Sequence, residues 1–378
     1  MHDTGHNDVS PELDRRLMAA GLRLGRRNLG QTHPNPAVGA LVVRHDSDGP
    51  IVVGRGWTAP GGRPHAETMA LEQAGDAARG ATIYTTLEPC AHDGKTPPCT
   101  DALIAAGPER VVMAIDDPDP RVSGKGRAAL EAAGIVVTDG VLAKEAARDH
   151  AGHFSLVQKG RPHVTLKLAV SADGMIGRRE GERMMITSKP ALTAVQAMRS
   201  TSDAVVIGIG TVLIDDPRLT VRLPGLAGLS PLRVVLDPSG RLPLDSRLVT
   251  TADKVPVMAV VGPAAPANAK AALIESGVQV VETSDGPNGL NLHEALAALG
   301  EAGMTRVLVE GGARVAASLL SEDLLDEIVL FRAPVVVGPD GVRALEGYAL
   351  SAIERSPRYR QIDAAIVGDD LMRRYWRD

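Results

Sequence analysis

Three potential zinc ligands and a neighbouring glutamate lie between residues 65 and 99 of the chain. His65 offers an imidazole, and Cys90 and Cys99 are the only cysteines among 378 residues. One imidazole and two thiolates fill three positions of a tetrahedral zinc site and leave the fourth for water, as a catalytic ion requires. Glu67 lies two residues beyond His65, where a carboxylate can transfer protons without binding the metal. The spacing therefore predicts zinc held by His65, Cys90 and Cys99, with Glu67 as the catalytic acid–base.

Two simpler interpretations of the cysteines are a disulfide and a pair of inert core thiols. The sequence has no signal-peptide core and no run of 18 apolar residues, so nothing indicates the oxidising compartment that favours disulfides. The motifs His65-Ala66-Glu67, Glu88-Pro89-Cys90 and Pro97-Pro98-Cys99 are specific in combination. Because zinc-activated water and a non-ligand glutamate are the chemistry of nucleobase deaminases, we expect a deaminase. Residues 91–96, between the cysteines, are expected to form a loop at the mouth of the site.

Length and charge limit the remaining possibilities. A chain of 378 residues exceeds one ordinary hydrophobic core, so two domains are expected. The first 150 residues carry 16 Lys+Arg and 20 Asp+Glu, and the remainder carries 25 and 26. Neither part is basic, which argues against a nucleic-acid partner. Without an apolar span we expect no membrane association, and the protein is predicted to be cytoplasmic.

The first half alternates helical and strand patterns. A helix is expected to begin with Ser10 as N-cap and Pro11 at the first helical position, and to run to about Leu29. A strand pair and further alternating elements should follow, which predicts a mixed sheet with helices on its faces. The expected strands are 37–43, 51–56, 81–87, 110–115 and 135–138, and the expected helices 65–75, 100–106 and 126–134.

The second half predicts another α/β domain. Strands are expected at 163–170, 204–208, 232–236, 255–261, 278–282, 306–309 and 328–337, with helices at 189–200, 265–277, 292–302 and 314–320. Gly208-Ile209-Gly210-Thr211 and Glu310-Gly311-Gly312-Ala313 each join a strand to the next element. Such turns let a phosphate approach backbone N–H groups, although either motif alone also makes ordinary tight turns. Arg199 and Arg222 are either phosphate partners or solvated surface charges.

Longer motifs identify a family. The chain resembles the bifunctional deaminase–reductases of riboflavin biosynthesis over about residues 10–345. In the first half the resemblance rests on residues 32–39 (THPNPAVG), 65–67 (HAE), 86–90 (TLEPC) and 94–99 (GKTPPC). In the second half it rests on residues 166–169 (LKLA), 171–174 (SADG), 186–188 (ITS), 211–222 (TVLIDDPRLTVR) and 310–312 (EGG).

The resemblance implies the fold and both reactions. Residues 10–150 would form a cytidine-deaminase-like, three-layer α/β domain, and residues 160–378 a dihydrofolate-reductase-like domain. The first domain would deaminate 2,5-diamino-6-ribosylamino-4(3H)-pyrimidinone 5′-phosphate with zinc. The second would reduce the ribosyl group of the product to ribityl with NADPH. The expected partner is this small-molecule substrate, and the expected quaternary state is a homo-oligomer.

The resemblance also implies roles for single residues. Substrate would be bound in the deaminase site by Asn35, which orients the pyrimidine, and by His92 and Lys95, which meet the ribose phosphate. The reductase substrate positions would be Arg199, Leu219, Arg222 and Glu310. The cofactor positions would be Ala169, Met185, Thr211, Asp215, Gly312, Ala313, Arg314, Val315, Ala316, Ala317 and Ser318.

One segment departs from the family. A small polar residue and a tryptophan usually precede Ile-Thr-Ser, whereas this chain has Arg183 and Met185 in their places. Met185 can still pack on a nicotinamide ring, and Arg183 either adds a substrate or cofactor contact or faces solvent. Alternatively, the two replacements weaken reduction. The alternative is an active deaminase with a catalytically silent C-terminal domain that serves binding or dimerisation. A deaminase of tRNA or free cytidine is disfavoured by the charge balance and by the loop around Lys95.

Overall fold

The computed structural model describes residues 10–178 and 185–378. The chain divides into two compact units, Met1–Gly160 (unit 1) and Arg161–Asp378 (unit 2). The helix Ala151–Lys159 (α6), which the sequence-based domain limits leave unassigned, belongs to unit 1. Among the described residues no helix is both long and apolar enough to span a bilayer.

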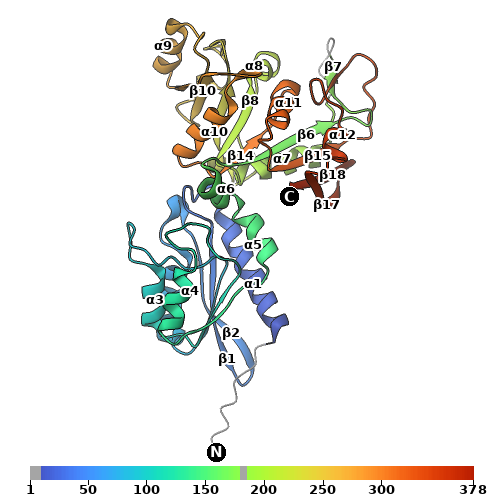
Figure 1. Cartoon of the computed structure of the whole chain (residues 1–378). Helices are drawn as coiled ribbons and strands as arrows, with labels where there is room; N and C mark the ends of the chain where they lie inside the picture. The colour runs from blue at the N-terminus through green and yellow to red at the C-terminus, as the bar shows by residue number, and fades with distance from the viewer. Residues whose placement is uncertain (1–9, 179–184) are drawn as a thin grey trace, which may run out of the picture. The chain divides into compact units, whose positions relative to one another are not determined.

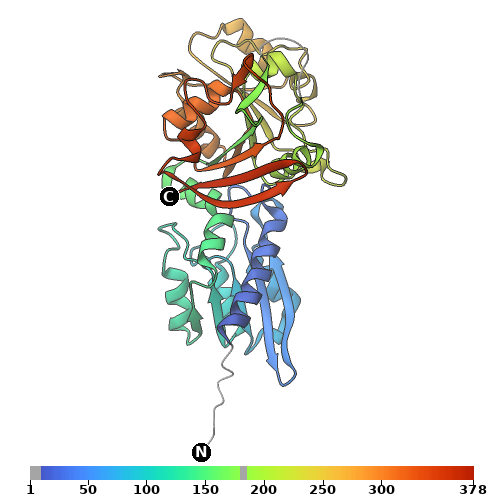
Figure 2. The same cartoon turned by 90° about the vertical axis from the view of Figure 1, so that its right-hand side faces the viewer.

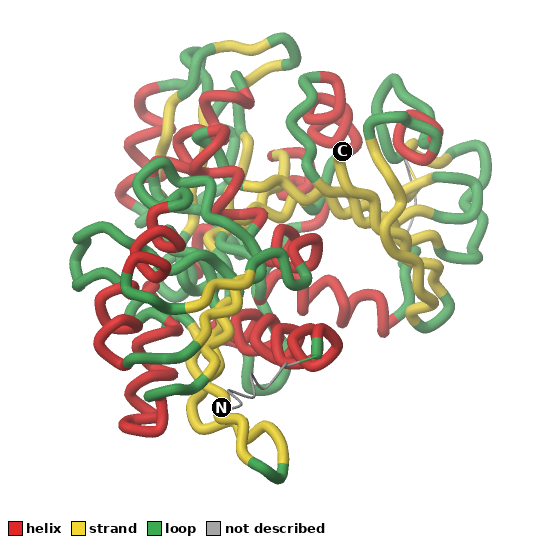
Figure 3. Tube along the Cα trace, turned by 60° about the horizontal axis from the view of Figure 1, so that its bottom comes forward, coloured by secondary structure: helices red, strands yellow, loops and turns green. Residues whose placement is uncertain are grey.

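Unit 1 is built on a five-stranded sheet in the order β2-β1-β3-β4-β5. Strand β1 is antiparallel to both of its neighbours, whereas β3, β4 and β5 are parallel. The hairpin formed by β1 and β2 is the long yellow arm that ends in a green turn in Figure 3. The strands are β1 (Gly39–Asp46), β2 (Gly49–Trp57), β3 (Thr82–Thr85), β4 (Arg110–Met113) and β5 (Val136–Thr138).

Helices cover both faces of this sheet (Figure 1). Leu41 and Val43 point to one face and Ala40 and Val42 to the other, because successive side chains of a strand alternate. The first face packs against α1 (Pro11–Gly25) and α5 (Ala143–Asp149). The second face packs against α2 (Ala66–Ala74), α3 (Cys99–Ala106) and α4 (Lys125–Ala132). Unit 1 is therefore a three-layer α/β/α domain.

The sheet of unit 2 has nine strands in the order β11-β10-β9-β8-β14-β6-β15-β18-β17. The seven strands from β11 to β15 are parallel, and β18 and β17 close one edge as an antiparallel hairpin (Figure 2). The strands are β6 (His163–Val170), β8 (Ala204–Gly208), β9 (Leu232–Leu236), β10 (Val257–Val261), β11 (Gln279–Glu282), β14 (Arg306–Val309), β15 (Glu327–Arg332), β17 (Tyr359–Val367) and β18 (Asp370–Arg377).

Helices and short strand pairs complete unit 2. Helices α10 and α11 pack on one face of the sheet, and α7, α8 and α9 pack on the other. The helices are α7 (Lys189–Ser200), α8 (Ile209–Asp215), α9 (Ala267–Glu275), α10 (Leu292–Glu301), α11 (Ala313–Ser321) and α12 (Ser351–Glu354). The short pairs are β7 (Met175–Arg178) with β16 (Gly341–Arg343), and β12 (Asp285–Gly286) with β13 (Gly289–Leu290).

Some element predictions need correction. The predicted first helix stops at Gly25 and continues as a 3₁₀ turn, Arg26–Asn28. The predicted strand 328–337 ends at Arg332, two residues before Pro334, which has no N–H to donate to a neighbouring strand. Helices α5, α6 and α8 and the hairpin β17–β18 were not predicted. The hairpin was missed because charged residues interrupt its hydrophobic alternation, as in Asp370-Leu371-Met372-Arg373-Arg374.

Two glycines allow α2 to lie directly on strand β2. A Cβ at Gly56 would stand 1.9 Å from the Ala66 carbonyl oxygen, and one at Gly54 would stand 2.2 Å from the Ala70 carbonyl oxygen. These clashes are with helix backbone, which cannot rotate aside as a side chain can. The absence of side chains at Gly54 and Gly56 therefore sets the distance between β2 and α2.

We predict that Gly56→Ala lowers the free energy of unfolding of unit 1 by about 3 kcal/mol, because the new methyl group overpacks the helix–strand contact. Thermal or urea unfolding of the full chain measures the loss. Gly21→Ala is the matched control, since its Cβ would make ordinary van der Waals contacts with Thr86 Cγ2 at 3.4 Å and the Gly39 carbonyl oxygen at 3.8 Å. Alanine is favoured within a helix, so this control should be neutral or stabilising. Equal stability of the two variants would contradict the prediction.

Candidate active sites

The three predicted zinc ligands come together at the ends of three elements of unit 1. His65 is the N-cap residue of α2, Cys90 follows β3, and Cys99 is the first residue of α3. The imidazole Nδ1 and the two Sγ atoms all lie within 4.8 Å of one another. His65 Nδ1 lies 3.2 Å from Cys99 Sγ and 3.8 Å from Cys90 Sγ.

These separations fit a tetrahedral zinc ion. With ordinary zinc–sulfur and zinc–nitrogen bond lengths, tetrahedral ligands stand about 3.6 Å apart. The pKa values of the two thiols also indicate a cation. The hydrogen bond between the thiols lowers the pKa of Cys90 to about 4. The same bond and burial raise the pKa of Cys99. Both can be thiolates only if a positive ion compensates the second charge. The residues present therefore fit zinc.

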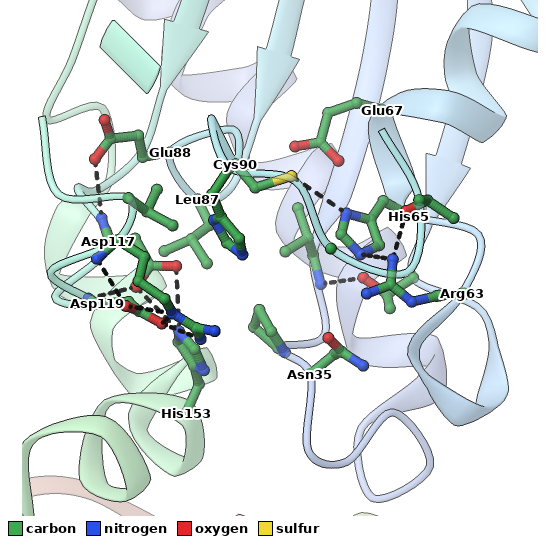
Figure 4. A pocket seen from close by; sticks show the side chains of 18 residues that line it. Asn35, Arg63, His65, Glu67, Leu87, Glu88, Cys90, Asp117, Asp119 and His153 are labelled. Carbon is green, nitrogen blue, oxygen red and sulfur yellow. Dashed lines mark hydrogen bonds and ion pairs between the residues drawn. The ribbon is translucent and has the colours of Figure 1, made fainter. Parts of the chain in front are cut away.

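Glu67 is buried on the first turn of α2 and faces the cysteines (Figure 4). Its Oε2 lies 3.6 Å from Cys99 Sγ, and its Oε1 accepts a weak hydrogen bond of 3.5 Å from Thr85 Oγ1. Burial raises the pKa of the Glu67 carboxyl, although the His65 imidazole opposes the shift. A carboxyl group with a raised pKa beside the metal site is suited to accept and return a proton.

An open pocket lies in front of this cluster and has two walls (Figure 4). One wall carries the zinc ligands His65 and Cys90 with Asn35 and Arg63. The other carries Glu88, which follows β3, several residues that follow β4, and one residue from α6. The second wall was not foreseen from the sequence. Its acidic and basic residues are Glu88, Asp117, Asp119, Arg121 and His153.

The predicted deaminase substrate residues differ in their placement. Asn35 and His92 line the pocket, and Gly62 backs the Asn35 side chain so closely that a Cβ there would overlap the amide. Lys95 is exposed on the same loop and is not among the lining residues. Arg63, which the sequence reading missed, donates to Thr96 Oγ1 at 2.5 Å and has no carboxylate partner in the part of the chain described.

In unit 2 the predicted substrate residues gather at the carboxyl ends of parallel strands. Arg199, at the end of α7, donates two hydrogen bonds to Glu310, of which the Nη2–Oε2 bond is 2.7 Å, and one of 3.0 Å to the Thr220 carbonyl. Burial opposes the charge on Arg199, but Glu310 outweighs it and raises the pKa. Leu219 is buried beside them with a positive φ of 55°.

A positive charge remains next to this ion pair. The Arg222 N–H donates to Gln196 Oε1, and its guanidinium reaches toward the Thr220 carbonyl. Burial lowers the pKa of Arg222, and the nearby cations Arg199 and Arg218 lower it further. Because the charge of Arg222 interacts with two other arginines and with only one carboxylate, Glu310, a bound anion would relieve the repulsion.

The predicted cofactor residues are grouped in part. A Cβ on Gly311 or Gly312 would lie 3.5 or 3.7 Å from Thr211 Oγ1, so the two glycine motifs meet. Gly312 has a φ of 86° and is the N-cap of α11, which spans the predicted residues Ala313 to Ser318. Met185 is exposed, while Ala169 packs near α7. Asp215 ends α8, and Arg183 lies outside the described residues.

Lys167 is a further candidate that the sequence reading passed over. It lies on β6, and its charge interacts with Glu310, Arg199 and Asp370. Burial lowers the pKa of its ammonium group. The signal was visible in the sequence, since a lysine interrupts the apolar strand pattern of residues 163–170.

Two family models match the chain, one in each unit. The cytidine and deoxycytidylate deaminase zinc-binding region matches residues 11–115. The RibD C-terminal domain matches residues 162–373. The first match includes His65, Glu67, Cys90 and Cys99, and the second includes the Arg199–Glu310 pair.

Relatives resemble the chain over nearly its whole length. Riboflavin biosynthesis protein RibD of Aquifex aeolicus is 40% identical over 362 residues, which cover 96% of this chain and 98% of that protein. The RibD protein of Escherichia coli is 36% identical, with 95% and 98% covered. The solved structure of Acinetobacter baumannii RibD has a TM-score of 0.85 at 35% identity and covers 98% and 100% of the two chains.

A second solved structure is similar to the chain over nearly the whole length of both. The crystal structure of a diaminohydroxyphosphoribosylaminopyrimidine deaminase/5-amino-6-(5-phosphoribosylamino)uracil reductase from Thermotoga maritima has a TM-score of 0.83. The two chains are 32% identical, with 97% of this chain and 99% of that chain covered.

Elemental analysis of protein purified without chelator should find about one zinc per chain, as three ligands and an open position predict. Removing the metal should lower the unfolding temperature of unit 1, because the site is completed only by a cation. Cys99→Ser should lower the zinc content and leave the unfolding of unit 2 unchanged. A Cys90–Cys99 disulfide in protein kept under reducing conditions would contradict the zinc site.

Proposed function

Because the chain belongs to the RibD family of riboflavin biosynthesis proteins, we propose that its substrate is 2,5-diamino-6-ribosylamino-4(3H)-pyrimidinone 5′-phosphate and its reductant NADPH. The chain is a bifunctional enzyme, with a zinc-binding deaminase in unit 1 and a reductase in unit 2. The observation that carries the assignment is the presence of both polar sites, the His65-Cys90-Cys99 cluster and the Arg199–Glu310 pair, in one chain.

In unit 1, His65, Cys90 and Cys99 would hold zinc, which supplies Lewis acidity that makes water a nucleophile near neutral pH. Glu67 accepts the proton of that water and passes it to the amino group that leaves as ammonia. Asn35 orients the pyrimidine ring from the wall beside the ligands. The net reaction replaces the ring amino group by oxygen and consumes one water.

The phosphate would lie at the cationic mouth of this pocket. Arg63 is held against the loop of residues 91–96 by its bond to Thr96, and no carboxylate among residues 10–178 and 185–378 pairs with its guanidinium. His92 and Lys95 come from the same loop. A planar guanidinium with additional donors is a suitable phosphate partner.

In unit 2, reduction requires a hydride at C1′ of the ribosyl group and a proton on the ring oxygen that leaves C1′. NADPH, when bound, would supply the hydride. The half-buried Lys167 has a lowered pKa, so it releases a proton more readily than an exposed lysine. Arg222 and Arg199 would bind the substrate phosphate, and the hydrogen bonds to Glu310 would hold the Arg199 guanidinium in place.

The competing hypothesis of a silent C-terminal domain is testable with the same protein. Purified enzyme is incubated with the diamino substrate, with and without NADPH, and the products are identified by mass spectrometry. We expect the deaminated ribosyl compound without NADPH and the ribityl compound with it. Accumulation of the deaminated compound under both conditions would favour the silent domain, and no deamination would refute the proposed function.

Glu67→Gln should lower the rate of deamination by at least ~10²-fold, because the amide cannot accept the proton. Zinc content should be unchanged, and the reductase should still act on supplied deaminated compound. Glu72→Gln on the exposed side of α2 is the matched control and should behave as wild type. Simultaneous loss of both activities would show that the two sites are not independent.

Lys167→Met should lower kcat for reduction by roughly 10²-fold, since the proton donor is removed. Lys167→Arg keeps the positive charge, so it should bind substrate with a KM near that of wild type but remain slow. Steady-state oxidation of NADPH measures both effects, with Lys254→Met as an exposed control. A fully active Lys167→Met enzyme would exclude the lysine as proton donor.

NADPH should be preferred over NADH, because the 2′-phosphate adds an anion that basic residues can bind. The preference should weaken as ionic strength rises, if exposed arginines provide the contact. Kinetics with both cofactors test this, and Arg183→Ala separates the contribution of that residue. Equal kcat/KM for the two cofactors at low salt would be the contrary result.

A further inference from the structure

The second wall of the deaminase pocket contains two carboxylates, each paired with its own basic side chain. Asp117 is paired with His153, and Asp119 with Arg121. All four residues line the pocket, and Figure 4 shows Asp117, Asp119 and His153 grouped opposite His65 and Arg63. Neither pair takes part in holding zinc or in the proton transfer assigned to Glu67.

The first pair is held inside the pocket wall. His153 Nε2 lies 3.0 and 3.2 Å from the two Asp117 oxygens, so its N–H donates to the carboxylate. The side chains are only 11% and 7% exposed. His153 comes from α6 and Asp117 from the segment after β4, so this contact joins two distant parts of unit 1.

The second pair is mostly exposed on its cationic side. Arg121 binds both oxygens of Asp119, with an Nη2–Oδ2 distance of 2.6 Å. The Asp119 side chain is 9% exposed, whereas that of Arg121 is 71% exposed. The hydrogen bonds from Arg121 lower the pKa of Asp119 to about 2, so the carboxylate is ionised.

Backbone contacts fix both carboxylates. The Asp119 N–H donates to Asp117 Oδ1 at 2.9 Å, which brings the two acids close together. Glu88, buried behind them, accepts from the backbone N–H groups of Asp117, Gly124 and Arg127 at 3.3, 3.0 and 3.1 Å. The wall is therefore preorganised, and the charge of Glu88 is already satisfied by backbone donors.

Such a wall poses an electrostatic problem for a phosphorylated substrate. Adjacent carboxylates suit the hydroxyl groups of a sugar, since ionised oxygens are strong acceptors. The same carboxylates repel a phosphate unless their charge is compensated. Arg121 solves this problem for Asp119, because its guanidinium compensates the charge of the carboxylate.

We propose that Asp117 and Asp119 determine specificity by accepting hydrogen bonds from the sugar hydroxyls, and that His153 and Arg121 are positioning residues. Arg121 neutralises Asp119 so that an anionic substrate can approach. His153 orients the Asp117 carboxylate toward the pocket. This inference rests on the proposed phosphoribosyl substrate of the deaminase.

Arg121 is tested with a cycle of Arg121→Ala, Asp119→Asn and the double variant, using zinc-loaded full-length enzyme. Deamination kinetics are compared for the phosphorylated substrate and its dephosphorylated nucleoside at low and high salt. Arg121→Ala should raise KM for the phosphorylated substrate about fivefold at low salt, and less at high salt, because exposed charges are screened. The kcat of Arg121→Ala for the phosphorylated substrate, and its KM for the nucleoside, should each stay within about twofold of the wild-type value. In the Asp119→Asn background the same replacement should have no effect.

His153 is tested with a donor-free and a donor-retaining variant. His153→Phe keeps an aromatic ring but should raise KM about tenfold for both compounds, because Asp117 loses its side-chain donor and keeps only the Asp119 N–H. His153→Gln, which keeps an N–H donor, should restore KM to near the wild-type value. Zinc content and unfolding temperature are measured for every variant to confirm that it is folded.

The outcomes are separable. Unchanged KM values in both Arg121→Ala and His153→Phe would overturn the inference, and so would equal effects of Arg121→Ala on the two compounds, which indicate a structural role. Equal impairment by His153→Phe and His153→Gln would overturn the role of His153. Failure of wild-type enzyme to deaminate the phosphorylated substrate would instead refute the proposed function.

Discussion

The close contact between helix α2 and strand β2 is the constraint on which the deaminase site depends. Helix α2 carries His65 at its N-cap and Glu67 on its first turn, so its position on the sheet fixes both. That position is set by two side chains that are absent, at Gly54 and Gly56. Cys90 follows β3 and Cys99 begins α3. The three ligands can therefore bind one zinc ion only if α2, β3 and α3 pack in the correct positions.

The two active sites use buried charge in different ways. In unit 1 a dense set of donors, two thiols, an imidazole and a carboxyl, is compatible with burial only when a cation is bound. In unit 2 Glu310 compensates one of the two positive charges of Arg199 and Arg222, and the other is left for the substrate. Each unit thus carries a site whose polar groups are fixed before substrate binds, which reduces reorganisation during the reaction.

The sequence predicted the α/β fold class, the family and the zinc cluster, because closely spaced motifs of rare residue types carry that information. The resemblance also implied that Thr211 and Gly312 are cofactor positions, and in the structure a Cβ on Gly312 would lie 3.7 Å from Thr211 Oγ1. The second pocket wall was invisible, since Asp117 and His153 are 36 residues apart and meet only through the packing of α6. The role of Lys167 does not follow from the sequence, because a lysine within a strand pattern is also typical of a solvent-exposed edge strand. Only the structure shows which charged residues lie next to it.

Helix α6 has a consequence for where the deaminase unit can be separated from the rest of the chain. His150, just before it, is buried and its ring lies 3.0 Å from the Thr86 carbonyl oxygen, while His153 reaches the pocket. A fragment ending at residue 149 would keep every zinc ligand and Glu67 and yet lack part of the pocket. An autonomous deaminase, whether made by recombinant truncation or by gene fission, must therefore extend to about residue 160, where the compact unit ends.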